Sequence, residues 1–283
     1  MKIKKIGVIG YGYVGKTVVD LFKDTCKVFY VDPAIPNDPY SSDFLQNEKV
    51  GAISVSMEYL NERYCDMVAI CVPTEMKKDR TCDISIVEKV VKEVEGKVIL
   101  IKSTVPPGTT DRLKKEVNKT IVFSPEFAGE SKYWSPYKFD TDMKESPWYI
   151  FGGEKKDVES VIDLFAPILG PTKQYRTTDS KTAELVKYWE NTFFAMKVTF
   201  CNEMFEICKA MKISYWEARE LWLNDPRVNE MHTAVFADNR GYGGKCFPKD
   251  TNGLVMASKE DGYDPKLLEA MIDSNKKFRK KNK

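Results

Sequence analysis

The sequence has only one histidine, His232, and no apolar stretch long enough to cross a lipid bilayer. It also has no recognisable N-terminal signal peptide, because the chain opens with Met1-Lys2-Ile3-Lys4-Lys5 and enters a strand-like run at once. A membrane-spanning or secreted protein is therefore not expected, and the expected location is the cytoplasm. The seven cysteines are an odd number, and in that reducing compartment they are expected to be thiols.

An excess of one charge sign is also missing from most of the chain. The formal net charge is +2, but six of the last eight residues are basic, which leaves −4 (+2 less 6) for the remainder. A mildly negative body is a poor candidate for nucleic-acid binding, so no nucleic acid is expected as a partner. The basic tail is interpreted as a solvated helix end, with an anionic partner as the alternative.

The first half of the chain alternates continuous apolar runs with amphipathic stretches. This alternation predicts an α/β fold, a Rossmann-type doubly wound parallel sheet with strands buried on both faces, followed by an all-helical domain. The predicted strands are 5–9, 28–31, 67–72, 98–101, 121–123, 148–151 and 174–176, and the predicted helices between them are 13–22, 110–117 and 156–169.

The second half begins with a long segment, 180–211, that contains neither proline nor glycine. Apolar side chains recur there every three or four residues, which predicts one amphipathic helix of about 45 Å. A stripe of this length favours a homodimer formed through the helix. A further helix is expected from Ser214, where Glu217 completes a capping box. The domains are accordingly predicted as a Rossmann domain over 1–178 and a helical, dimer-forming domain over 179–283.

A GxGxxG pattern, Gly10-Tyr11-Gly12-Tyr13-Val14-Gly15, links the first predicted strand to the first predicted helix. One glycine makes the tight turn, one lets the backbone approach a pyrophosphate, and one lets helix and strand pack closely. The phosphates would lie at the helix N-terminus, where free N–H groups attract anions. Asp32 ends the second strand at the spacing expected for a carboxylate that binds the adenosine ribose, and no arginine follows it. NAD is therefore predicted in preference to NADP.

A second glycine-rich segment, 241–250, contains a candidate nucleophile. Its sequence is Gly241-Tyr242-Gly243-Gly244-Lys245-Cys246-Phe247-Pro248-Lys249-Asp250. Pro248 suits the first turn of a following helix, so Cys246 would lie just before a helix N-terminus, near two lysines. Both features favour the thiolate, which is the nucleophilic form. Cys71, Cys201 and Cys208 are interpreted instead as small core residues.

Taken in order, these motifs resemble the UDP-glucose/GDP-mannose dehydrogenase family, and the resemblance covers nearly all of the chain. Besides the two glycine-rich segments, it rests on Cys71-Val72-Pro73-Thr74, Lys102-Ser103-Thr104-Val105-Pro106-Pro107-Gly108, Ser124-Pro125-Glu126-Phe127, Glu184-Leu185-Val186-Lys187-Tyr188-Trp189-Glu190-Asn191-Thr192 and Asn224-Asp225-Pro226-Arg227.

The resemblance implies two successive oxidations of a sugar C6 alcohol to a carboxylate, each reducing one NAD. Cys246 would form a thiohemiacetal and then a thioester. Lys187 and Asn191, one helical turn apart, would stabilise the oxyanion. On spacing alone, however, Lys187 could equally be a solvated helix lysine.

In the same family chemistry, Asp250 and Thr104 would position or activate water. Glu126 would act as the general base, with Glu130 beside it, although from the sequence alone Glu126 could be an ordinary loop carboxylate. This chemistry does not require His232, since a lone loop histidine is more often structural than catalytic.

The resemblance also assigns binding residues, and no metal is expected. The cofactor residues are Gly10, Gly12, Tyr13, Val14, Gly15, Asp32, Val72, Pro73, Thr74, Ser103 and Thr104. The substrate residues are Glu126, Phe127, Glu130, Lys187, Asn191, Arg227, Tyr242 and Gly243. Arg227 matches an arginine that often acts across a dimer, and UDP-glucose is the expected substrate because 241–244 resembles that branch of the family.

The chain departs from the family in three places. Only 33 residues follow Asp250, whereas typical members carry a further C-terminal α/β domain there. The segment after Asp32 is short, and Phe127-Ala128-Gly129-Glu130 replaces a common Leu-Arg pattern. Three interpretations are therefore compatible with the sequence. The chain could be an active enzyme whose missing domain comes from a second chain, or an active enzyme with a smaller substrate or an open site. It could also be a binding subunit without turnover.

An alternative enzyme class is a 3-hydroxyacid dehydrogenase related to 3-hydroxyisobutyrate dehydrogenase. Such enzymes have a similar length and also place a lysine on the long helix, here Lys187. They transfer a single hydride and use no cysteine nucleophile. The number of NADH molecules formed per substrate separates the two classes.

Overall fold

The protein is described from a computed structural model that covers residues 3–36, 50–127 and 142–280. The chain forms two compact units. Unit 1 comprises Met1–Thr74 and Asp83–Lys187, and unit 2 comprises Glu75–Cys82 and Tyr188–Lys283. The division therefore falls after Lys187 rather than near residue 178, and a short segment that follows the fourth strand belongs to unit 2.

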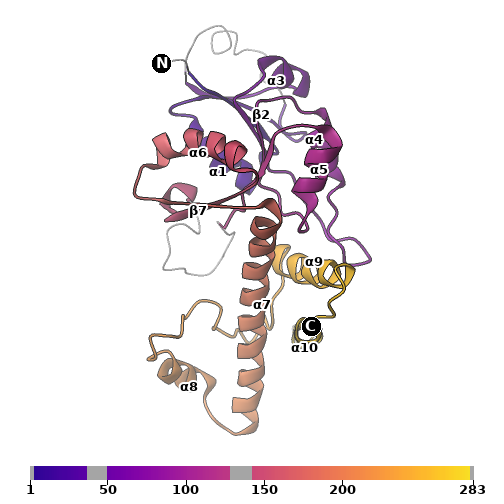
Figure 1. Cartoon of the computed structure of the whole chain (residues 1–283). Coiled ribbons are helices and arrows are strands. Elements are labelled where there is room, and N and C mark those ends of the chain that lie inside the picture. The colour runs from indigo at the N-terminus through magenta and orange to yellow at the C-terminus, as the bar shows by residue number, and fades with distance from the viewer. Residues whose placement is uncertain (1–2, 37–49, 128–141, 281–283) are drawn as a thin grey trace. The chain divides into compact units, whose positions relative to one another are not determined.

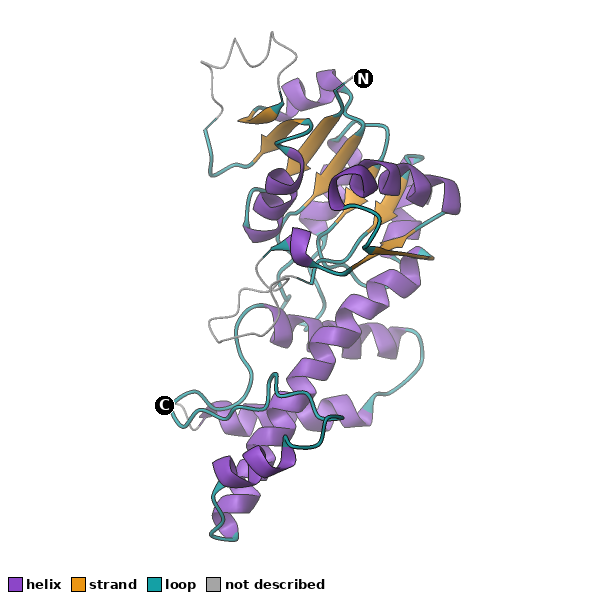
Figure 2. Ribbon diagram, turned by 90° about the vertical axis from the view of Figure 1, so that its left-hand side faces the viewer, coloured by secondary structure: helices purple, strands orange, loops and turns teal. Residues whose placement is uncertain are grey.

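In the described part of unit 1, eight strands form one sheet in the order β3-β2-β1-β4-β5-β6-β7-β8 (Figure 2). The strands are β1 (Lys5–Ile9), β2 (Lys27–Val31), β3 (Gly51–Ser54), β4 (Met67–Ile70), β5 (Ile99–Ile101), β6 (Ile121–Phe123), β7 (Trp148–Gly152) and β8 (Gln174–Thr178). The predicted α/β fold with a doubly wound parallel sheet is confirmed. Parallel pairing is interrupted at one place, where Phe123 of β6 faces Gly152 of β7 in antiparallel register.

Helices cover both faces of this sheet (Figure 1). One apolar core joins the sheet to α1 (Tyr13–Phe22) and α6 (Lys155–Leu169), where the rings of Phe22 and Phe165 meet edge to face at 5.1 Å. A second core joins the opposite face to α3 (Met57–Arg63), α4 (Ser85–Glu93) and α5 (Thr109–Val117). A short 3-10 helix, Met143–Glu145, precedes β7.

Sequence patterns missed β3, α3 and α4. Only two of the four residues of β3 are buried, so this outer strand has no continuous apolar run. Helix α4 is apolar on one face alone, through Val87, Val90 and Val91. A weak edge strand and a short surface helix carry too little hydrophobic signal to stand out from their surroundings.

Unit 2 is helical. It contains most of α7 (Ser180–Ala210), together with α8 (Tyr215–Trp222), α9 (Cys246–Glu260) and α10 (Lys266–Arg279). The predicted long helix is confirmed almost to the residue. One small core gathers Ala195, Tyr242, Val255, Met271 and Ile272, and another gathers Cys201, Cys208, Tyr215 and Val235. Among the described residues, no helix combines the length and the apolarity that a membrane span requires.

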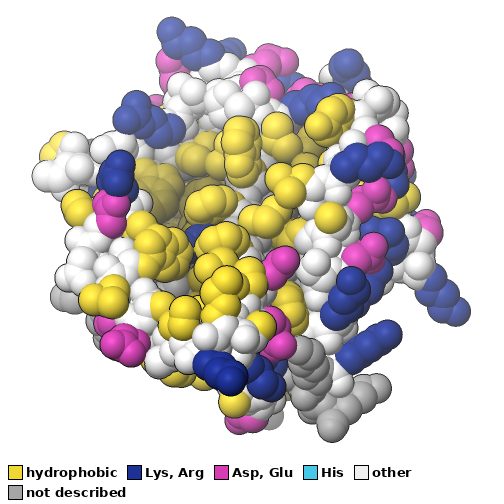
Figure 3. All heavy atoms as spheres, turned by 90° about the horizontal axis from the view of Figure 1, so that it is seen from below, with side chains coloured by type: hydrophobic (Ala, Val, Ile, Leu, Met, Phe, Trp, Pro, Cys, Tyr) yellow, Lys and Arg dark blue, Asp and Glu magenta, His cyan; other side chains and the backbone are white. Residues whose placement is uncertain are grey.

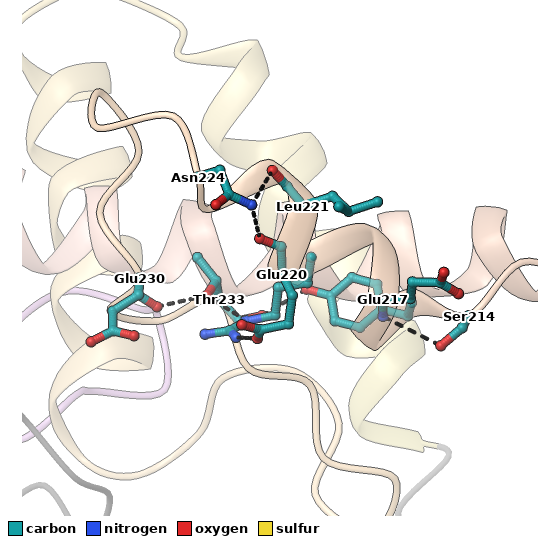
Figure 4. Close-up of polar contacts among 9 residues, drawn as sticks. Ser214, Glu217, Glu220, Leu221, Asn224, Glu230 and Thr233 are labelled. Atoms are coloured by element: carbon teal, nitrogen blue, oxygen red, sulfur yellow. Dashed lines mark hydrogen bonds and ion pairs between the residues drawn. The ribbon is translucent and has the colours of Figure 1, made fainter.

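The predicted N-cap at Ser214, at the start of α8, is also confirmed (Figure 4). Ser214 Oγ accepts a hydrogen bond of 3.3 Å from the backbone N–H of Glu217, and α8 begins at the next residue, Tyr215. At the other end, Asn224 Nδ2 donates to the carbonyls of Glu220 and Leu221. Side chains therefore satisfy backbone groups that a helix leaves without partners at both of its ends.

The first turns of α7 are joined to α5 within unit 1 by a buried carboxylate. Glu184 is completely buried and accepts hydrogen bonds from the backbone N–H groups of Gly108 (2.5 Å) and Thr110 (2.8 Å) and from Thr110 Oγ1 (2.6 Å). It therefore caps the N-terminus of α5, where a negative charge is favoured. Burial nevertheless outweighs these donors and raises the pKa of Glu184 to about 7.

This raised pKa predicts a pH-dependent stability. The ordinary pKa of a glutamate carboxyl group is 4.5, so between pH 4.5 and about pH 7 the folded chain holds a proton that the unfolded chain has released. The stabilisation by this proton is complete below pH 4.5 and is lost as the pH rises through about 7. Between about pH 5 and pH 8, the free energy of unfolding of the wild type should fall by about 2 to 3 kcal/mol more than that of Glu184→Gln. Urea denaturation at a series of pH values measures both, and parallel curves for the two proteins would contradict the assignment.

Candidate active site

The predicted site residues occur in both units, and each unit is described by itself. In unit 1 the described ones, apart from Lys187 of α7, follow the carboxyl ends of the parallel strands β1, β2, β4, β5 and β6. Ligands of doubly wound folds bind at this edge, at the point where the strand order reverses. Here the reversal lies between β1 and β4, which are neighbours in the sheet.

The three glycines of the first motif have different surroundings. Gly10 has a positive φ of 89°, and a Cβ there would lie 2.6 Å from the carbonyl oxygen of Cys71. A Cβ on Gly15 would lie 1.8 Å from the carbonyl oxygen of Gly10, so only glycine lets α1 approach β1 this closely. Gly12 is the N-cap of α1 and has open space where its side chain would be. A pyrophosphate could occupy such a space against the first turn of α1, which contains Tyr13 and Val14.

Asp32 is fixed beside this turn. Its Oδ2 accepts a hydrogen bond of 2.7 Å from the backbone N–H of Tyr11, and its Oδ1 accepts one of 2.8 Å from Ala34. The carboxylate therefore lies at the end of β2, next to the glycine turn. The surroundings fit an NAD molecule, whose ribose hydroxyls a carboxylate at this position can bind.

The loops after β4 and β5 are joined to each other. Ser103 is buried, and its Oγ donates a hydrogen bond of 2.7 Å to the carbonyl of Val72. Thr74 is buried as well, whereas Pro73 is exposed and Thr104 is half-buried. This hydrogen bond holds two of the predicted cofactor segments together.

Glu126, which follows β6, pairs with a buried lysine that sequence reasoning did not single out. Lys102 Nζ lies 3.4 Å from Glu126 Oε2 and 3.4 Å from Ser124 Oγ. The Lys102 side chain is 2% exposed and that of Glu126 is 11% exposed. The available signal was a charged residue placed directly after the apolar strand Ile99–Ile101.

Two other predicted residues of unit 1 meet nearby. Lys187 Nζ lies over the ring of Phe127, 5.3 Å from its centroid, which is a cation–π geometry. Burial of the neighbouring Cys71 thiol raises its pKa to about 12, so this cysteine is a poor nucleophile. Glu130 lies outside the described residues.

In unit 2, Cys246 is the first residue of α9 and is exposed. Of the other six cysteines of the chain, five are buried and Cys71 is half-buried. Helix α9 begins at Cys246 itself rather than just after it, and Pro248 lies in the first turn as predicted. All seven cysteines are free thiols in the described chain. A helix N-terminus presents free backbone N–H groups at this position.

The carboxylate of Asp250 lies one turn further along α9 and is 1% exposed. Asn191 Nδ2 of α7 donates a hydrogen bond of 2.5 Å to Asp250 Oδ2, and Lys249 Nζ lies 2.5 Å from Asp250 Oδ1. Within unit 2, Asn191 and Asp250 are therefore brought into direct contact. Lys187 lies one turn before Asn191 on the same helix.

The remaining predicted residues have separate environments. Arg227 is exposed and forms a bidentate ion pair with Asp225, which raises the pKa of the Arg227 guanidinium. The Tyr242 side chain is buried in a core of unit 2, so its ring is a packing group. His232 stacks on Phe194 with ring centroids 4.4 Å apart. In the described residues, no group of three or more potential ligand side chains is arranged to hold a metal ion.

Two family models match the chain. The model described as "UDP-glucose/GDP-mannose dehydrogenase family, NAD binding domain" matches residues 38–168, and the one described as "UDP-glucose/GDP-mannose dehydrogenase family, central domain" matches residues 181–277.

Curated relatives match over almost the whole chain. UDP-glucose 6-dehydrogenase AglM of Haloferax volcanii is 27% identical over 96% of this chain and 69% of its own length. UDP-glucose 6-dehydrogenase TuaD of Bacillus subtilis is 29% identical over 98% of this chain and 64% of its own length. The chain thus spans about two thirds of the length of these relatives.

Two solved structures establish the fold alone. A UDP-glucose dehydrogenase from Pyrobaculum islandicum superposes with a TM-score of 0.76 at 23% identity, covering 97% of this chain and 68% of that one. A 3-hydroxyisobutyrate dehydrogenase from Mycobacterium tuberculosis superposes with a TM-score of 0.69 at 14% identity, covering 98% of this chain and 94% of that one.

The buried pair formed by Lys102 and Glu126 predicts a non-additive effect of mutation. Lys102→Met leaves a buried carboxylate without its cation and should lower the free energy of unfolding by about 3 kcal/mol. Lys102→Met combined with Glu126→Gln should cost less than the sum of the two single changes by about 1 kcal/mol or more. Urea denaturation of the four proteins completes this cycle, and additive values would mean that the two side chains do not interact.

Proposed function

Because the chain belongs to the UDP-glucose/GDP-mannose dehydrogenase family, a family of NAD-dependent nucleotide-sugar dehydrogenases, we propose that it oxidises the C6 alcohol of a nucleotide sugar to a carboxylate. UDP-glucose is the substrate that the relatives favour. The observation that carries the proposal is an exposed thiol, Cys246, at the first residue of a helix whose next turn holds Asp250 against Asn191.

When bound, NAD would supply the hydride acceptor, and each of the two oxidations would reduce one NAD molecule. Unit 1 provides the glycine turn for its pyrophosphate and Asp32 for its ribose. The loops that contain Val72, Pro73, Thr74, Ser103 and Thr104 would border the nicotinamide. The hydrogen bond from Ser103 to Val72 supports this proposal, because it keeps two of these loops together.

In the first oxidation, the C6 alcohol loses a hydride to the cofactor and a proton to a base. Glu126 is the proposed base, directly or through water, and its contact with Lys102 holds its carboxyl group in place after β6. Thr104 would orient the same water. Phe127 and Glu130 are proposed to contact the sugar, and Arg227 and the backbone of Gly243 to contact the nucleotide sugar as well.

In the second oxidation, the Cys246 thiolate adds to the carbonyl carbon of the aldehyde, and a C–S bond forms as the carbonyl oxygen becomes an oxyanion. Lys187 and Asn191 are proposed to stabilise that oxyanion. Loss of the second hydride gives a thioester. Water then replaces sulfur at the carbon, which releases the carboxylate and returns the thiol, with Asp250 positioning the water.

A 3-hydroxyacid dehydrogenase has the same fold, as the superposition of 3-hydroxyisobutyrate dehydrogenase shows. The exposed Cys246 favours the nucleotide-sugar reaction, because single hydride transfer needs no thiolate. A binding subunit without turnover would need neither Cys246 nor the buried Asn191–Asp250 pair. Both alternatives are outcomes of the experiment that follows.

The test is to count NADH formed per substrate. With a nucleotide sugar, the wild type should form two NADH per molecule consumed, and Cys246→Ser should slow the second oxidation by about 10³-fold or more and release an aldehyde. Cys208→Ser, which changes a buried thiol of the same unit, is the matched control and should keep both oxidations.

One NADH per hydroxyacid, with undiminished turnover by Cys246→Ser, would establish the hydroxyacid class instead. NAD binding with no turnover of any substrate would indicate the binding subunit. Each assay is run with the chain alone and then with any protein encoded beside it, because a second chain that supplies a further domain remains a proposed partner.

We further propose a homodimer through α7. Along its unit 2 part, large apolar side chains remain exposed, among them Phe200 (50%), Ile207 (38%) and Met211 (65%) just beyond its end. On α8, Leu221 and Trp222 are exposed as well. Figure 3 shows hydrophobic side chains gathered on the face seen from the end of Figure 1 where α7 finishes. An apolar surface of this extent is typical of a protein–protein interface.

The dimer predicts that charge on this stripe dissociates the protein. Phe200→Glu combined with Ile207→Glu should give a monomer at micromolar concentration where the wild type is a dimer. Lys209→Glu is the matched control, because residue 209 lies on the same exposed helix but about 200° away from residue 207. Light scattering coupled to size-exclusion chromatography measures the masses, and a monomeric wild type would exclude the proposed dimer.

A further inference from the structure

The backbone just before Cys246 is held by asparagine side chains from two helices of unit 2. Asn202 of α7 accepts hydrogen bonds at Oδ1 from the backbone N–H of Gly241 (3.1 Å) and from Nε of Arg240 (2.7 Å). Asn275 of α10 accepts one at Oδ1 from the backbone N–H of Tyr242 (2.8 Å). Asn275 Nδ2 in turn donates to the carbonyl of Tyr242 (3.0 Å).

Asn275 therefore satisfies both backbone polar groups of one residue, as a paired strand would. Its side chain is buried, with 7% of the residue exposed. A buried backbone group needs a partner, and a side-chain amide can supply a donor and an acceptor at once. This arrangement fixes the rotation of the peptide groups on either side of Tyr242.

Two glycines of the segment, Gly241 and Gly243, lie against side chains of α10. Gly241 has a positive φ of 70°, and a Cβ on it would lie 2.5 Å from Asn275 Oδ1. A Cβ on Gly243 would lie 3.1 Å from Cζ of Arg279, whose Nη1 donates to Asn239 Oδ1 at 2.7 Å. Side chains of α10 thus occupy the space that side chains at 241 and 243 would fill.

From Tyr242 the chain reaches Cys246 in four residues. The Tyr242 ring is buried and lies against Phe247, with ring centroids 6.4 Å apart. The segment is therefore held at its start by Asn275 and at its end by the packing of Phe247. Both α9 and α10, coloured yellow in Figure 1, belong to the last part of the chain.

We propose that Asn275 is a positioning residue for Cys246, which it sets through the backbone of Tyr242 without touching substrate or cofactor. This inference rests on the proposed function for its kinetic consequences. The thiol is needed only after the aldehyde has formed. A displaced thiol should therefore impair the second oxidation and spare the first.

Asn275→Ala is the decisive variant, and Lys277→Ala is its control, because Lys277 is an exposed residue two positions further along α10. In Asn275→Ala the second oxidation should slow by about 10- to 100-fold, as expected when a reacting group is misplaced by about 1 Å. The first oxidation should remain within about twofold of the wild type, so NADH per substrate should fall from two toward one. Lys277→Ala should retain both rates.

Two further measurements do not depend on turnover. In Asn275→Ala, hydrogen exchange at the Tyr242 amide should be faster, and alkylation of Cys246 by iodoacetamide, followed by peptide mass mapping, should be slower by about tenfold. If Asn275→Ala fails to fold, Asn275→Asp replaces it, because aspartate has the same size as asparagine and leaves no cavity. It keeps the acceptor for the Tyr242 N–H but cannot donate to the Tyr242 carbonyl, and the same losses are expected.

The proposal is overturned if Asn275→Ala keeps two NADH per substrate and unchanged alkylation of Cys246. It is also overturned if both oxidations decline equally while alkylation is unchanged, since that result describes a purely structural residue. A wild type that oxidises no nucleotide sugar would refute the proposed function, and the exchange and alkylation measurements would still decide the role of Asn275.

Discussion

The close approach of α1 to β1 is the constraint on which the cofactor edge depends. A single methyl group on Gly15 would lie 1.8 Å from the carbonyl oxygen of Gly10, so the helix could not start where it does. Because the helix starts there, Tyr11 reaches Asp32, and Gly10 packs against the backbone that follows β4. The loops that follow β1, β2 and β4 thus meet at the glycine turn, where Gly10 and Gly15 carry no side chain.

Several buried ionisable side chains lie at the ends of secondary-structure elements in the described residues. Glu184 lies against the first turn of α5, and Asp250 is shared between Asn191 and Lys249. Lys102 and Glu126 follow adjacent parallel strands and meet at their carboxyl ends. Element ends provide free backbone groups and nearby polar side chains, which supply the hydrogen bonds that a buried ionisable group needs. The residues proposed to carry out the chemistry are held by the same contacts that hold the fold.

Much of the fold and part of the site could be predicted from the sequence. Continuous apolar runs located β1 and β6, and the absence of proline and glycine located α7, because burial on two faces and helical periodicity leave direct patterns. The order of the motifs predicted that Asn191 and Asp250 belong to the same active site, and the structure shows that their side chains are in contact. Lys102, Asn202 and Asn275 could not be found in this way. Their roles come from contacts across 22 to 39 positions of the sequence, which local patterns do not record.

The segment Glu75–Cys82 has a consequence for how the chain can be divided. The chain leaves unit 1 after Thr74 and returns to it at Asp83, and the segment between is joined to α9 within unit 2 by the 2.7 Å hydrogen bond from Arg80 Nε to Asn252 Oδ1. The polypeptide consequently crosses between the units three times, at 74/75, 82/83 and 187/188. No single cleavage point yields two intact halves. A fragment ending at Lys187 would retain this segment without its helical partner, and one beginning at Tyr188 would lack it.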